Sequence, residues 1–151
     1  MPSPDIATIL RQSVEKANPR TKRIFGGDHA MSPQEVEAFL APGPVGLIAT
    51  IGPARTPHMA PTTIFFVDGR IYFSAGEGSA TQRHLQRNPK VGVAVVEPPW
   101  TRHLMVQGTV RFLAPDTEEM LRVQAFQKAL RGRATSTLVA VEAQTIFTWK
   151  G

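Results

Sequence analysis

The stretch that decides the fold covers residues 56–90 and reads TPHMAPTTIFFVDGRIYFSAGEGSATQRHLQRNPK. An apolar run over residues 57–67 ends at Asp68-Gly69, a dipeptide typical of hairpin turns, and a second apolar run follows over residues 70–74. Ser79 then begins one or two helical turns. This order predicts two antiparallel strands joined by a tight turn and followed by a short helix.

Further strands are predicted on both sides of this hairpin. Short apolar or alternating runs occupy residues 45–51, 91–97, 102–113 and 138–149. Sequential strands without long crossovers favour an antiparallel barrel or meander over a doubly wound parallel sheet. Neither a G-x-G-x-x-G motif after a strand nor a Walker loop occurs, so Rossmann and P-loop folds are excluded.

Capping residues predict where the other helices begin. Residues 3–5 (SPD) predict the start of an N-terminal helix, and Ser32 with Glu35 forms a capping box ahead of a second helix. Asp116 predicts the cap of a helix whose apolar residues recur every three or four positions. Residues 20–31 are polar and contain two adjacent glycines, so we expect a loop there.

The composition is that of a single globular domain. The chain has 151 residues, of which 42% are hydrophobic and 19% are charged. No apolar run approaches the roughly 18–20 residues that a membrane-spanning helix needs, and the N-terminus lacks the pattern of a secretory signal. We therefore expect a cytoplasmic protein with no membrane partner.

Cysteine and histidine content argues against a metal centre. The chain has no cysteine, which excludes disulfides, thiolate catalysis and cysteine-ligated metals. Its four histidines, His29, His58, His84 and His103, do not form a closely spaced ligand pair, so no metal site is predicted.

The net charge of +5 does not by itself indicate a nucleic-acid partner. The Lys and Arg residues are spread out, with no run of five, and the aromatic residues lie mostly in apolar contexts. No nucleic-acid partner is predicted. A solvated surface or a site for a phosphorylated small molecule explains the charge equally well.

Residues 56–90 resemble the flavin-binding segment of the pyridoxamine-phosphate-oxidase-like family, which includes many deazaflavin-using relatives. The likeness lies in a strand reading x-P-H-x-x-P, a D-G hairpin leading to Y-F-S, and a Ser-headed turn that closes on R-x-L-x-x-N-P-K-V. It extends through Trp100 and residues 105–110 to the final strand at residues 146–149. The resemblance implies a mainly β (α+β) fold, a six-stranded antiparallel split β-barrel with peripheral helices.

The same resemblance predicts the organisation and the activity of the chain. Residues 32–151 would form the split-barrel flavin-binding domain, after an N-terminal helical extension and loop at residues 1–31. The flavin would lie in a groove between the two subunits of a homodimer, and the protein would be an FMN-binding oxidoreductase acting on a small-molecule substrate. A deazaflavin-dependent reductase and a non-catalytic flavin-binding protein remain the alternatives. Because the cofactor carries the hydride chemistry in such enzymes, no side chain is predicted as a catalytic acid or base.

Cofactor-binding residues also follow from the resemblance, position by position. The strand beside the ring system would be His58, Met59, Ala60, Pro61, Thr62 and Thr63. The ribityl and phosphate side would be Phe73, Ser74, Ser79 and Thr81, with Arg83 as a nearby cation, and His103 would touch the edge of the isoalloxazine.

The chain departs from the family pattern where the phosphate would bind. The family usually has Arg or Lys at the positions of His58, Thr63, Ala80 and Thr81, and this chain has neither at any of them. A charge-assisted hydrogen bond contributes about 1.5–3 kcal/mol, so the departure predicts weaker binding of the phosphate.

Overall fold

The computed structural model describes residues 4–151, so the part of the first predicted cap at residue 3 lies outside the described residues. The helices are α1 (Ile6–Lys16), α2 (Pro19–Phe25), α3 (Pro33–Leu40), α4 (Ala80–Arg87) and α5 (Glu118–Arg131), with short 3-10 turns at Gly27–His29 and Pro53–Arg55. The strands are β1 (Val45–Ile51), β2 (Pro57–Thr63), β3 (Phe65–Val67), β4 (Arg70–Ser74), β5 (Lys90–Glu97), β6 (Arg102–Phe112) and β7 (Leu138–Lys150).

The strands form one antiparallel sheet in the order β2-β1-β5-β6-β7-β4-β3. The predicted α+β class with an antiparallel sheet is confirmed, but the predicted count of six strands is wrong because the sheet has seven. The run predicted as one strand over residues 57–67 divides at Ile64. This residue is fully buried, and its amide donates a hydrogen bond to the carbonyl of Pro44 (2.9 Å) instead of continuing the ladder.

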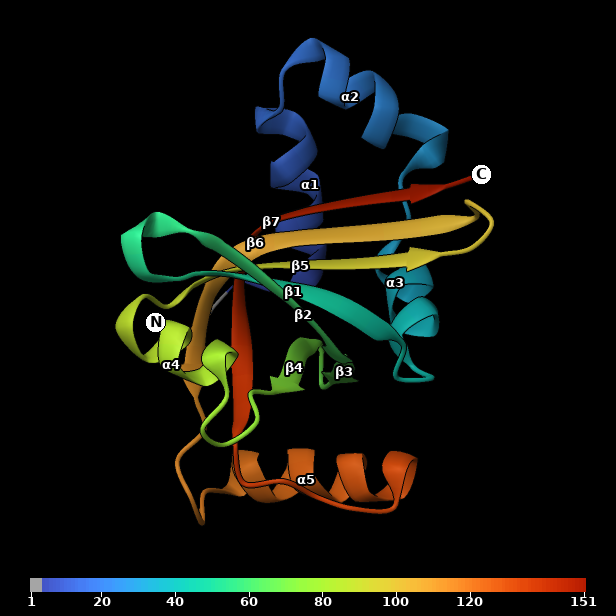
Figure 1. Cartoon of the computed structure of the whole chain (residues 1–151). Coiled ribbons are helices and arrows are strands. Elements are labelled where there is room, and N and C mark those ends of the chain that lie inside the picture. Colours follow the sequence, from blue (N-terminus) through green and yellow to red (C-terminus); the bar gives the residue numbers. More distant parts are fainter. Residues whose placement is uncertain (1–3) are drawn as a thin grey trace.

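A β-bulge bends β7 so that this strand serves two parts of the sheet. The ladder between β6 and β7 shifts register after Gln107, which leaves Gln144 as the extra residue. Gly108 lies at this point, and a Cβ there would collide with the carbonyl oxygen of Glu142. The part of β7 before the bulge lies nearer to α5 and pairs with β4, and the part after it pairs with β6 alone (Figure 1).

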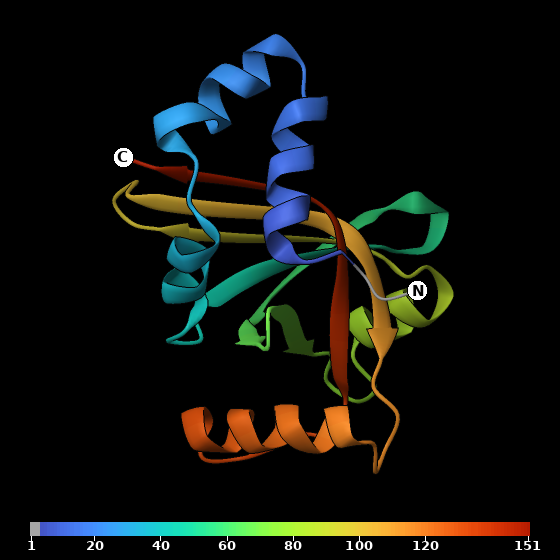
Figure 2. The same cartoon turned by 180° about the vertical axis from the view of Figure 1, so that it is seen from behind.

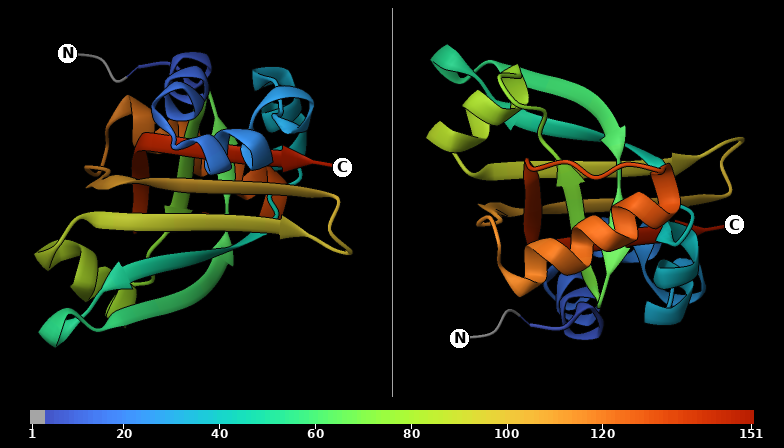
Figure 3. Two further views of the ribbon diagram at one scale, coloured as in Figure 1. Left: turned by 90° about the horizontal axis from the view of Figure 1, so that it is seen from above. Right: turned by 90° about the horizontal axis from the view of Figure 1, so that it is seen from below.

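Two apolar cores lie on either side of this bent sheet. The larger core fills the half-barrel with side chains such as Ile48, Phe73 and Leu104, which are all but inaccessible to solvent. The smaller core packs α5 onto β3, β4 and β7 around Phe65 and Val123. Figure 3 shows α5 crossing this end of the molecule.

The helix caps largely follow the sequence signals. Asp5 caps α1, and Ser32 with Glu35 forms the predicted capping box of α3. The cap of α5 is Thr117 and not the predicted Asp116, which instead takes a left-handed backbone conformation with φ of 62°.

The loop predicted over residues 20–31 is wrong in part, because α2 occupies the whole of its first half. Asn18 caps this helix and Pro19 takes its first position, so the residues that end α1 also begin α2. Phe25 packs against Phe147 of β7, with 5.6 Å between the ring centroids. This tertiary contact stabilises a helix that the polar composition of the segment does not reveal.

Helix α1 covers the edge of β7 that has no neighbouring strand (Figure 2). The hydroxyl of Ser13 accepts a hydrogen bond from the amide of Ile146 (2.9 Å) and donates one to the carbonyl of Ile9 (2.6 Å). An exposed strand edge invites pairing with other chains, and α1 removes that exposure here.

Over residues 4–151, none of the helices combines the length and the apolar character needed to cross a membrane.

Candidate functional site

The barrel stays open where β2 approaches β4. Within residues 4–151 no backbone ladder joins these two strands, since β2 is the end of the sheet order and β4 pairs with β7 and β3. The link between them is a hydrogen bond from the hydroxyl of Thr62 to the carbonyl of Ser74, at 3.5 Å. That distance is long for such a bond, so the two strands are only weakly tied together.

A pocket of about 240 Å³ lies in this gap, at the N-terminal end of α4. Seven of the twelve predicted cofactor-binding residues line it: Ala60, Pro61, Thr62, Phe73, Ser74, Ser79 and Thr81. Ile48 and Gly76 complete the lining and were not predicted. Ile48 lies in a strand outside the deciding stretch, and Gly76 has the sequence signal of an ordinary turn.

The polar groups of this pocket are uncharged donors suited to an anion. Ser79 caps α4 by accepting a hydrogen bond from the amide of Gln82 (3.1 Å). The amides of Ala80 and Thr81 precede the first intrahelical hydrogen bond, so the helix itself does not use them. The hydroxyl of Thr81 and the positive end of the helix dipole add to this set, whereas the hydroxyl of Ser74 is hydrogen-bonded to those of Thr135 and Thr137. Among the described residues, the pocket has no Lys or Arg in its lining.

Three predicted residues lie close to this pocket without lining it. Met59 is on the opposite face of β2, where 61% of its surface is exposed. Thr63 accepts a hydrogen bond from Arg131 (3.0 Å) at the end of the same strand. Arg83 donates to the carbonyl of Gly78 (2.6 Å), so its guanidinium fastens the preceding turn to α4.

His58 packs against α4 and forms a histidine pair. Its ring lies edge-on to that of His84, with 4.9 Å between the ring centroids, and Nδ1 of His84 is 3.1 Å from the hydroxyl of Thr50. Burial, followed by the charges of His58 and Arg83, lowers the pKa of His84, which favours its neutral ring. In the part of the chain that the structure describes, no third His, Asp or Glu joins the pair to make a metal site.

His103 lies away from the pocket, on the outward face of the sheet. It pairs across the ladder with Val96 and is 7% exposed, with its ring stacked on Trp149 (5.4 Å) and edge-on to Trp100 (4.2 Å). Neither ring nitrogen of His103 has a hydrogen-bond partner among the described residues. His29 stacks on the other side of Trp149, which completes a small aromatic cluster at the end of the sheet.

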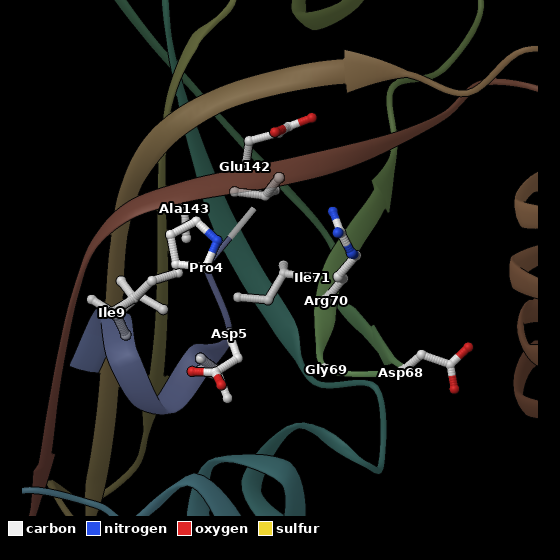
Figure 4. Close-up of a pocket in the computed structure, with 12 residues that line it drawn as sticks. Pro4, Asp5, Ile9, Asp68, Gly69, Arg70, Ile71, Glu142 and Ala143 are labelled. Carbon is white, nitrogen blue, oxygen red and sulfur yellow. The ribbon is translucent and has the colours of Figure 1, made fainter. Parts of the chain in front are cut away.

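A separate pocket of about 230 Å³ lies between the first turn of α1 and the turn that joins β3 to β4 (Figure 4). Ile9 and Ile71 give it an apolar floor. Two of its acidic side chains have structural tasks, because Asp5 caps α1 and Glu142 accepts a hydrogen bond from Arg111 (2.9 Å). None of the twelve predicted cofactor-binding residues lines this pocket, whereas seven of them line the gap between β2 and β4.

Solved structures with the same fold include proteins of differing character. The conserved hypothetical protein Rv2991 from Mycobacterium tuberculosis has 22% identity and a TM-score of 0.69, over 82% of this chain and 88% of its own. An FAD-binding protein from Mesorhizobium loti has 17% identity and a TM-score of 0.59, over 78% of this chain and 92% of its own. The heme storage protein HutZ from Vibrio cholerae has 13% identity and a TM-score of 0.60, over 78% of this chain and 89% of its own. At these identities the likeness shows a shared fold.

No curated protein is significantly similar to this chain in sequence. The family model of pyridoxamine 5'-phosphate oxidase, however, matches residues 32–150. The match covers well over half of the chain and includes every strand of the sheet. The resemblance seen in the sequence is confirmed, and the chain belongs to the pyridoxamine 5'-phosphate oxidase family.

Proposed function

We propose that this chain is an FMN-dependent oxidoreductase that works as a homodimer on a small-molecule substrate. The observation that carries the proposal is the pocket in the gap between β2 and β4, where Ala60, Ser74 and Ser79 meet from a strand, a second strand and a helix cap. Family membership and the FAD-binding neighbour support a flavin as the ligand of this fold.

The residues present fit a flavin phosphate and one edge of a flat ring. Ala60 is small and half-buried, which leaves room beside β2, and the hydroxyls and amides around Ser79 and Thr81 would hold the phosphate. The pocket is smaller than the roughly 300–1,000 Å³ typical of ligand sites, so the ring system would extend out of the gap toward a second subunit. Phe73 and Ile48, both fully buried, would keep water from the inner side. When bound, the flavin would supply the hydride chemistry, while these residues orient it.

An apolar outward face of the sheet supports the homodimer. The register places Pro61, Leu47, Ala94 and Met105 in one row across β2, β1, β5 and β6. The large apolar side chains exposed on this face are Val45, Leu47, Met59, Val96 and Met105. Monomeric proteins rarely expose a continuous apolar patch of this kind, and a second copy of the chain would bury it.

Light scattering during size-exclusion chromatography tests the dimer. We expect a dimer at micromolar concentration, and a shift toward monomer when Leu47→Asp places a charge in the row. Exposed Leu121 of α5 offers the matched control, since Leu121→Asp changes a residue on another surface and leaves the dimer intact. A wild-type protein that elutes as a stable monomer contradicts the proposal.

A titration of the purified protein with FMN, with the deazaflavin cofactor and with heme tests the ligand. We expect saturable quenching of FMN fluorescence, and reduction of the bound flavin by a nicotinamide donor then separates an enzyme from a carrier. If only the fluorescence of the deazaflavin is quenched saturably, the deazaflavin and not FMN is the ligand. If the heme absorption band shifts and FMN does not bind, heme is the ligand.

A further inference from the structure

We propose that His84 is a positioning residue, whose neutral ring holds α4 where the first amides of this helix can bind the phosphate of FMN, so that acidification weakens FMN binding. The inference rests on the proposed function, because it concerns the cofactor phosphate at the start of α4. His84 does not line the pocket in the gap between β2 and β4, and it follows the free amides of Ala80 and Thr81 by about one helical turn. Its effect on the phosphate is therefore transmitted through the position of the helix.

The ring of His84 joins α4 to both strands of the β1–β2 hairpin, and Figure 3 shows this helix beside the turn of the hairpin. Nδ1 of His84 lies 3.1 Å from the hydroxyl of Thr50 on β1, a residue that is 3% exposed. The ring of His58 on β2 is edge-on to that of His84, with 4.9 Å between the centroids. A Cβ at Gly52, in the turn, would lie 3.2 Å from Cε1 and Nε2 of His84. The ring thus sets how closely α4 approaches the hairpin.

The other side-chain hydrogen bonds around α4 hold the helix to the turn before it. Within residues 4–151 these bonds join Ser79 with Gln82 (3.1 Å), Gln82 with Gly78 (2.7 Å) and Arg83 with Gly78 (2.6 Å). Leu85 packs into the larger core, but apolar packing has no preferred direction. Among the described residues, the hydrogen bond between His84 and Thr50 is the one that ties a side chain of α4 to the hairpin. We therefore expect the direction of the free amides at the start of α4 to depend on His84.

The elements around His84 carry cations and no anions. Neither α4, β1, β2 nor the turn between the two strands contains an Asp or Glu. The polar groups that these elements contribute are basic or uncharged, namely Arg83 and Arg87 on α4, Thr50 on β1, His58 on β2 and Arg55 in the turn. A proton on His84 would therefore add a positive charge to a group of cations, which costs free energy.

The titration of His84 links the position of α4 to pH. Burial, followed by the charges of His58, Arg83 and Arg87, lowers the pKa of His84 below its ordinary value of 6.5. Above about pH 6.5 the ring is neutral whether α4 is docked on the hairpin or detached from it. As the pH falls below that value, a detached helix leaves His84 free to take a proton that the docked helix disfavours, so detachment becomes more favourable. Detachment would turn the free amides away from the phosphate.

Amide hydrogen exchange of the flavin-free protein tests the docking of α4, because it reports detachment even when the detached state is rare. Between about pH 7.5 and about pH 5.5, we expect the protection of residues 83–87, corrected for the intrinsic effect of pH on exchange, to fall about three- to tenfold. His84→Asn should remove this fall, since the amide of Asn can replace Nδ1 at Thr50 and takes no proton. His29→Asn is the matched control, because His29 stacks on Trp149 away from α4 and should leave the fall unchanged.

FMN titration of the same proteins tests the effect on the cofactor. We expect the wild-type Kd to rise about three- to tenfold more than that of His84→Asn over the same pH range. The phosphate of FMN itself titrates at about pH 6, and the ratio of the two Kd values cancels that effect. Riboflavin lacks the phosphate and should show no such difference between the two proteins.

Three results overturn the inference. One is an NMR titration of the wild-type protein that gives the His84 ring a pKa above its ordinary 6.5, a measurement that needs no variant. Another is an equal pH dependence, in the wild type and His84→Asn, of the protection of α4 or of the FMN Kd. The third is FMN binding that tightens on acidification. Failure of FMN to bind at either pH, with the exchange response intact, overturns the proposed function and leaves the role of His84 in docking α4 standing.

Discussion

Strand β4 has one sealed side and one open side. Toward β7 and α5, the hydroxyl of Tyr72 donates to Glu119 (2.8 Å), and Arg111 bridges Glu119 (2.8 Å) and Glu142 (2.9 Å). Toward β2, the link is the 3.5 Å hydrogen bond between Thr62 and Ser74, with uncharged hydroxyls and helix amides around it. Both sides are rich in polar groups, but the sealed side pairs charged groups with one another, whereas the open side keeps backbone amides at the start of α4 that the helix does not use.

The hydrogen bonds of the sealed side shift the pKa values of the groups that form them. Hydrogen bonds from Arg111, together with that from Tyr72, lower the pKa of Glu119, and burial followed by the contact with Glu119 raises the pKa of Tyr72 to about 12. Both shifts mean that folding favours the protonation states that bond to each other. Polar groups with satisfied partners hold the fold, whereas those with spare hydrogen-bonding capacity are the ones that a ligand can engage.

The largest expected effect comes from filling the open side. Ala60→Leu adds bulk beside β2 where the flavin ring would lie, so we expect FMN affinity to fall at least about 100-fold with little change in melting temperature. Fluorescence titration and thermal unfolding measure both. Ala125→Leu, which makes the same change at an exposed position of α5, is the control and should bind FMN normally.

Two outcomes contradict this assignment of β2. One is an Ala60→Leu variant that binds FMN as the wild type does. The other is a variant that loses about 1–3 kcal/mol of stability through overpacking and binds less only because it unfolds.

Removing a hydrogen bond from the sealed side should lower the stability of the fold and leave FMN affinity unchanged. Tyr72→Phe removes the phenol hydroxyl and its hydrogen bond to Glu119, so we expect a loss of about 1–2 kcal/mol in the free energy of unfolding. FMN affinity should not change, because the contact faces α5. Urea unfolding measures the free energy of unfolding, and titration of the same preparation measures the FMN affinity. A Tyr72→Phe variant with weakened FMN binding would argue against two separable sides.

A cation added to the open side sharpens the comparison. Thr81→Lys restores the charge that the family usually has at this turn, so we expect FMN to bind about tenfold more tightly. Riboflavin, which lacks the phosphate, serves as the control ligand and should gain nothing. Equal effects on both ligands would show that the phosphate does not lie at the start of α4.

The smallest effect is a pH dependence of the sealed side. The pKa of Tyr72 lies at about 12 in the folded protein, above its ordinary value of 10.0, so the folded state favours the protonated phenol. This contribution is complete below about pH 10 and is lost as the pH rises from about 10 to about 12. The difference in melting temperature between the wild type and Tyr72→Phe should therefore shrink across that range. A difference that stays constant would exclude the phenol as its source.

Features that depend on near neighbours in the sequence could be predicted, and features set by distant residues could not. The Ser32–Glu35 capping box and the Asp68-Gly69 turn are decided within a few positions. The break at Ile64 depends on a carbonyl twenty residues away in the sequence, and neighbouring residues are equally apolar.

The candidate site divides in the same way. Most of the pocket lining lies within residues 60–81, so a single stretch of sequence with a family resemblance was enough to name it. Arg131 donates to Thr63, beside the pocket, from 68 positions further along the chain, and no local motif marks it. Arg83 shows the converse. It is close in the sequence, but its guanidinium donates a hydrogen bond to the carbonyl of Gly78 and does not line the pocket.

The contact between α1 and β7 joins one of the first elements to be synthesised with the last strand of the sheet. Ser13 is synthesised 133 residues before Ile146, the strand residue from whose amide it accepts a hydrogen bond. Strand β7 also lies between β6 and β4 in the sheet. Until residues 138–150 emerge, the apolar side of α1 has no strand to cover and two strand edges stand unpaired. The nascent chain therefore cannot complete its barrel until β7 is made, and those edges stay open to pairing with other chains until then.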